Sequence, residues 1–171
     1  MKPVSMIIRS FVAILFAAFA TSALAITGAW TGAISDGTHN PQVVTYRFSP
    51  TGNPILKFAS RNGWREIEVQ GVGQRAQWLL PRSGYSTGVV EAFHVGQHHV
   101  QVVIAISTTS GGGNLLDQSE RRVALDFRLG PNGLETVVAQ ESLNHSSGVG
   151  LGLYAGSRTR AVSQGMLQRI D

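Results

Sequence analysis

Apolar side chains recur at every second position along most of the chain, and glycine-containing turns interrupt them about every 8–12 residues. No segment keeps apolar residues at the i, i+3 and i+4 spacing of an amphipathic helix. All 20 glycines lie after residue 25, where turns need them. The pattern predicts an all-β protein, an antiparallel meander closed or nearly closed into a small barrel of about 8–10 strands.

The first 25 residues have the layout of a cleavable signal peptide. Lys2 and Arg9 give a positive start, residues 11–20 are apolar, and Ala23 and Ala25 form a small-x-small cleavage signal. An apolar run of that length is too short to cross about 30 Å of hydrocarbon. We therefore expect residues 26–171 to form a single β-barrel domain without a stable membrane span. The short leader favours a bacterial protein, periplasmic or secreted.

The composition limits the classes of partner that this protein can have. Without Lys2 and Arg9, twelve basic and ten acidic residues remain, a net charge of +2. The arginines are scattered, whereas nucleic-acid binding needs a clustered basic stripe, so no nucleic-acid partner is expected. Cysteine is absent, which excludes disulfides and a lipid-modified cysteine after the leader. Stability must then come from the core, and no cofactor is predicted.

Residues 87–107 read as a central hairpin that turns at Gly96-Gln97, because glycine at the first central position suits a type II′ turn. The expected pairs are Phe93 with Val100, Glu91 with Val102, Val89 with Ile104 and His94 with His99. One face is then apolar except for Glu91. A carboxylate there must find an arginine or other hydrogen-bond donors, or stay protonated. Either Glu91 pairs with an arginine or lies near the barrel mouth, or it is the polar anchor of a ligand pocket.

Two further hairpins are predicted from their turns. Asn62-Gly63 favours a type I′ turn, which would pair Lys57 with Glu68 and Phe58 with Ile67. Residues 130–133 (GPNG) favour a second turn. It would place Leu129 opposite Leu134, Leu125 opposite Val138, Arg128 opposite Glu135 and Arg122 opposite Glu141. Between the central hairpin and the hairpin that turns at residues 130–133, residues 107–118 are so rich in glycine that a mobile loop is expected.

Residues 26–30 (ITGAW) resemble the opening Gly-x-Trp strand of lipocalins and avidins, in which the tryptophan closes the barrel floor. The resemblance implies a closed barrel and makes Trp30 a candidate ligand contact. Gly32 and Asp36 stand where an avidin would place polar ligand-contacting residues, so no biotin site is implied.

Motifs for chemistry are weak. His94 and His99 share a face in the expected register but His98 does not, so a zinc site, which needs three or four ligands, is not predicted. Residues 84–88 match the G-x-S-x-G pattern around Ser86, yet a strand follows where a nucleophile elbow needs a helix. We expect no catalytic residue.

The favoured function is a soluble exported binding module. Its partner would be a small hydrophobic or amphipathic ligand in a barrel interior, or another envelope protein. Two alternatives stay open: an outer-membrane barrel, and an enzyme without a recognisable motif. The first would need outward apolar bands and aromatic girdles, whereas Arg/Glu pairs are expected on the outer face and the chain ends Ile170-Asp171.

Overall fold

The computed structural model describes residues 25–81, 84–112, 115–148 and 154–170. Except for Ala25, the expected leader lies outside these residues. The described part contains strands and no helix. The ten strands are β1 (Gly28–Ser35), β2 (Gln42–Phe48), β3 (Pro54–Ser60), β4 (Gly63–Glu68), β5 (Arg75–Leu79), β6 (Tyr85–Val95), β7 (His99–Gly112), β8 (Leu115–Gly130), β9 (Gly133–Gly148) and β10 (Tyr154–Arg169).

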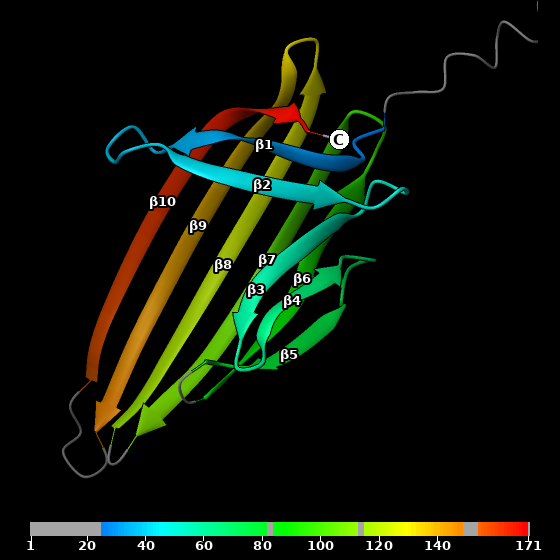
Figure 1. Ribbon diagram of the computed structural model, residues 1–171. Coiled ribbons are helices and arrows are strands. Elements are labelled where there is room, and N and C mark those ends of the chain that lie inside the picture. The colour runs from blue at the N-terminus through cyan, green and yellow to red at the C-terminus, as the bar shows by residue number, and fades with distance from the viewer. Residues whose placement is uncertain (1–24, 82–83, 113–114, 149–153, 171) are drawn as a thin grey trace, which may run out of the picture.

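All ten strands belong to one antiparallel sheet in the order β4-β3-β2-β1-β10-β9-β8-β7-β6-β5. The first and last strands of the chain are therefore neighbours, and the two sheet edges are β4 and β5. The sheet curls into a half-barrel in which β1 and β2 cross the upper ends of the long strands β7 to β10, while β3, β4 and β5 lie at one side (Figure 1). The predicted all-β, nearly closed meander of 8–10 strands is confirmed.

The core fills the end of the half-barrel where β1 and β2 cross the long strands. Phe127 is fully buried there and contacts the rings of Tyr46 and Phe48 edge-on, at centroid distances of 4.9 and 5.1 Å. Val100, Leu134 and Leu167 are also fully buried. These side chains come from strands far apart in sequence, so their burial holds the closure of the sheet together.

The β8–β9 hairpin has the predicted register. Leu129 pairs with Leu134, Leu125 with Val138, Arg128 with Glu135, and Arg122 with Glu141. Apolar pairs lie on the concave face and charged pairs on the convex one, as expected from the alternation of side chains along a strand.

The predicted register of the central hairpin is wrong. Phe93 pairs with Val102, and the ladder shifts at a bulge between Val90 and Ala92, beyond which Val90 pairs with Ile104. The backbone hydrogen bond from Gly96 N to His99 O places the turn at residues 97–98. Gly96 does not have the positive φ that a type II′ turn requires at its first central position.

The predicted pairing of Lys57 with Glu68 is also wrong. Lys57 lies opposite Glu66, and Leu56 opposite Ile67, because the turn is centred on residues 61–62. No described residue other than glycine has a positive φ, which excludes a type I′ turn with Asn62 in its centre. Gly63, which follows the turn, has a positive φ of 101°, as in hairpins where a type I turn is followed by one residue in the left-handed conformation.

The prediction of a mobile loop at residues 107–118 is also wrong. β7 continues to Gly112 and β8 begins at Leu115, so most of this segment is paired strand. Ladder hydrogen bonds to a long partner strand offset the entropic cost of ordering the glycines here.

The described residues include no helix that is long and apolar enough to cross a membrane.

Candidate functional site

An apolar hollow of about 320 Å³ lies inside the half-barrel, beside the packed core. Strands β2 to β9 all contribute to its lining. The side chains that give it its apolar character include Leu56, Phe58, Ile67, Trp78, Ile104 and Leu125. Its volume is at the low end of the roughly 300–1,000 Å³ of ligand sites, which suits a small molecule.

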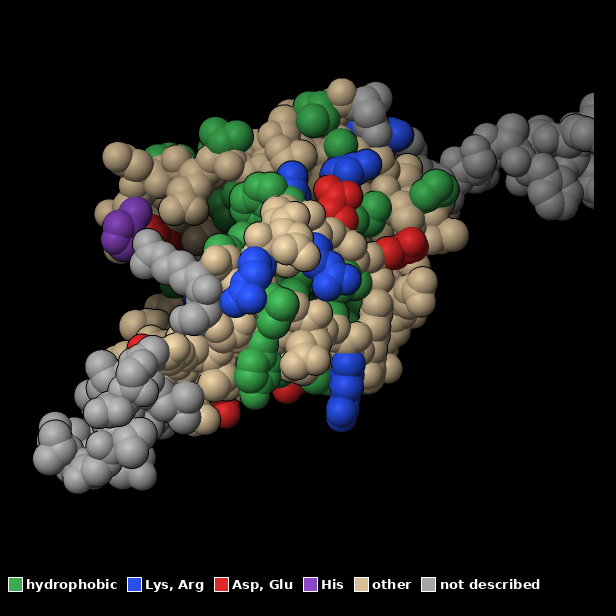
Figure 2. Space-filling view, turned by 60° about the horizontal axis from the view of Figure 1, so that its bottom comes forward, with side chains coloured by type: hydrophobic (Ala, Val, Ile, Leu, Met, Phe, Trp, Pro, Cys, Tyr) green, Lys and Arg blue, Asp and Glu red, His purple; other side chains and the backbone are tan. Residues whose placement is uncertain are grey.

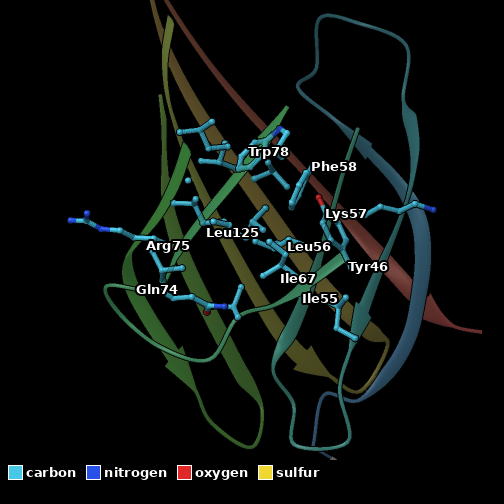
Figure 3. Close-up of a pocket in the computed structure, with 18 of the residues that line it drawn as sticks. Tyr46, Ile55, Leu56, Lys57, Phe58, Ile67, Gln74, Arg75, Trp78 and Leu125 are labelled. Carbon is cyan, nitrogen blue, oxygen red and sulfur yellow. The ribbon is translucent and has the colours of Figure 1, made fainter. Parts of the chain in front are cut away.

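The alternation of side chains along each strand produces this lining. Leu56 and Ile67 are cross-strand partners on one wall, and Leu125 pairs with both Val102 and Val138 on the opposite wall. Figure 3 shows Leu56, Ile67 and Leu125 directed into the hollow, whereas the charged ends of Lys57 and Arg75 point away from it. The charged groups of Lys57 and Arg75 therefore lie outside the hollow, although both residues are at its rim.

Tyr46 supplies a polar group to the hollow. Its hydroxyl has no hydrogen-bond partner among the described residues, and burial raises the pKa of this phenol above its usual value. The neutral hydroxyl can both donate and accept a hydrogen bond. Gln74 is less available, since its amide Oε1 accepts from Gln70 N and its Nε2 donates to Glu68 O.

The two edges of the sheet, β4 and β5, meet beside the hollow without a backbone ladder between them. We call this junction, residues 63–68 against 75–79, the seam. Arg61 N donates to Leu79 O at 2.9 Å at one end of the seam, and the Gln74 amide spans the other. Between these two contacts, the rings of Phe58 and Trp78 pack against each other with their centroids 4.2 Å apart. Packed side chains thus close the barrel wall between β4 and β5, where no ladder of backbone hydrogen bonds joins the two strands.

A second, more polar hollow of about 470 Å³ adjoins the seam. Ser60, Asn62, Arg65 and Gln77 line it, and Trp78 belongs to the linings of both hollows. In Figure 2, which brings the lower end of the molecule forward, apolar side chains lie beside Lys and Arg side chains on this face.

The large side chains expected in the interior divide between core and hollow. Trp30 is buried at 6% exposure in the core, where its Nε1 donates to Thr27 O, and it does not line the hollow. Phe127 and Phe93 also pack in or against the core, whereas Phe58 and Ile67 line the hollow. This division is the reason that the interior is filled at one end only. The ligand contact of Trp30 stays a prediction without support from this placement.

Glu91 does not lie on the apolar inner face, so its expected position is wrong. The bulge beside Val90 turns it to the convex surface, where its carboxylate accepts from Arg122 Nε at 2.7 Å. The side chains of Glu91 and Arg122 are 39% and 62% exposed. The arginine pairing weighed for Glu91 is present, and a role as pocket anchor has no geometric basis in the apolar hollow.

His94 and His99 do not pair in the ladder, but their rings lie 5.4 Å apart on the convex face. His99 Nε2 contacts Asp126 Oδ2 at 3.1 Å, and Arg128 takes the other carboxylate oxygen. Among the described residues, no group of three or more His, Asp or Glu side chains is placed to hold a metal ion.

Ser86 is buried within β6 and shares a hydrogen bond of 2.7 Å with Thr108. A strand and not a helix surrounds it, so the arrangement of a nucleophile elbow is missing at this serine.

Comparisons with family models, curated proteins and solved structures find no match to this chain. The assignment of a site therefore depends on geometry alone. Sequence reasoning does not identify Tyr46 or Trp78 as residues of a site. The signal that could have found them is the alternation of apolar side chains in residues 44–48 and 76–80.

Proposed function

We propose that this protein is an exported binding protein that holds one small hydrophobic or amphipathic ligand in the hollow lined by Leu56, Ile67 and Leu125. The observation that carries the proposal is the hollow itself, an apolar space of about 320 Å³ beside a fully packed core. Apolar walls with few polar groups are typical of small-molecule sites. Tyr46 offers such a polar group.

Filling the hollow tests the proposal. Val138 lines it, so Val138→Phe should weaken the binding of 1-octanol at least about tenfold, a loss of roughly 1.4 kcal/mol, in isothermal titration calorimetry. The matched control is Val137→Phe, because neighbouring residues of a strand point to opposite faces.

The control should bind 1-octanol as the parent protein does. Equal binding by all three proteins, or no binding to any of them, would contradict a ligand site in this hollow. Circular dichroism of each variant verifies that the sheet is intact.

A further inference from the structure

The polar hollow beside the seam is lined by a cation, Arg65, that lies next to the apolar hollow. Arg65 lies directly opposite Phe58 in the β3–β4 ladder, so both side chains emerge on the same face of the sheet. Phe58 in turn lines the apolar hollow and stacks on Trp78. Arg65 is thus next to the apolar site, on the other side of one ring pair.

Arg65 has no acidic partner among the described residues. The one hydrogen bond that it makes to a described residue runs from its Nη1 to the backbone carbonyl of Gln77, at 3.4 Å. By contrast, Arg47, Arg122, Arg128 and Arg158 all contact carboxylates. Most of the guanidinium donors of Arg65 are therefore available, and a guanidinium matches the geometry of a carboxylate.

The surroundings of Arg65 suit an anionic head group. Ser60 and Asn62, which line the same hollow, carry hydroxyl and amide groups that can donate hydrogen bonds. Trp78 lines both hollows, so the two adjoin at this side chain. A molecule with a short apolar chain and a charged end would match both.

We propose that the ligand is a small amphipathic carboxylate, with its apolar chain in the hollow lined by Leu56 and Leu125 and its carboxylate on Arg65. The chain passes beside the Phe58–Trp78 ring pair. This inference rests on the proposed function, since it requires the apolar hollow to take the tail. It adds the chemical class of the head group and the residue that selects it.

Octanoate and 1-octanol test the inference at pH 7, because they share a chain and differ in charge. Arg65→Met should weaken octanoate binding at least about tenfold and leave 1-octanol binding within about twofold. Arg65→Lys, which keeps the charge, should restore part of the octanoate affinity. Arg160→Met is the matched control, because Arg160 lies opposite Glu141 on the convex face and lines neither hollow.

The outcomes separate the two proposals. If 1-octanol binds and Val138→Phe weakens it, but Arg65→Met leaves octanoate unchanged or weakens both ligands equally, only the carboxylate site is overturned. The same holds if Arg160→Met has as large an effect on octanoate as Arg65→Met. If neither ligand binds the parent protein, the apolar hollow fails as a site, and the carboxylate site fails with it.

Discussion

Two glycines make the joint between the first and last strands sterically feasible. A Cβ atom at Gly165 would lie 2.1 Å from Ala33 O, and one at Gly32 would lie 2.4 Å from Met166 O. Both neighbours are backbone atoms, which cannot move away as a flexible side chain can. Glycine is needed here for close approach of two strands, and a sequence alone does not distinguish this need from that of a turn.

Gly165→Ala should lower the free energy of unfolding by about 1–3 kcal/mol, because the added methyl group forces β1 away from β10. Gly71→Ala is the control, since a Cβ there meets nothing within 4 Å and Gly71 has no positive φ. Urea denaturation of the two variants measures the difference. Equal stability of both would show that the joint tolerates a side chain.

At the scale of elements, the β8–β9 hairpin could be predicted because apolar and charged pairs agreed on one register. The β6–β7 hairpin could not, since the bulge beside Val90 exchanges the faces within one strand. A register that is extended from the turn without a bulge therefore places Glu91 on the inner face. The lining of the apolar hollow could not be predicted for a related reason: its wall includes the seam, which depends on how two edge strands meet in three dimensions.

The seam should be the least protected part of the sheet in hydrogen exchange. Strands β4 and β5 each have one sheet neighbour, whereas β8 and β9 are hydrogen-bonded on both sides. Backbone amides of β4 and β5 should therefore exchange with smaller opening free energies than those of residues 123–127 and 134–138 in native-state exchange followed by NMR. Protection of β4 and β5 equal to that of β8 would mean that a ladder closes the seam.

At the scale of the whole molecule, the length of the strands and the closure through β1 and β10 divide the interior into two parts. Aromatic and aliphatic side chains from seven strands, β1, β2 and β6 to β10, form the core around Phe127, and the remaining interior contains the apolar hollow. The sequence predicts a barrel of about this size, but only the pairing of distant strands decides whether its centre is packed or hollow.

The most direct test of the ligand site is to locate a bound probe by NMR. In methyl-labelled protein with 1-octanol, we expect intermolecular NOEs to the methyl groups of Leu56, Ile104 and Val123, which line the hollow. Val43 and Val162, which are 81% and 46% exposed, should show none. NOEs confined to such exposed methyl groups, or none at all, would contradict the account of this protein as a half-barrel with a ligand-binding interior.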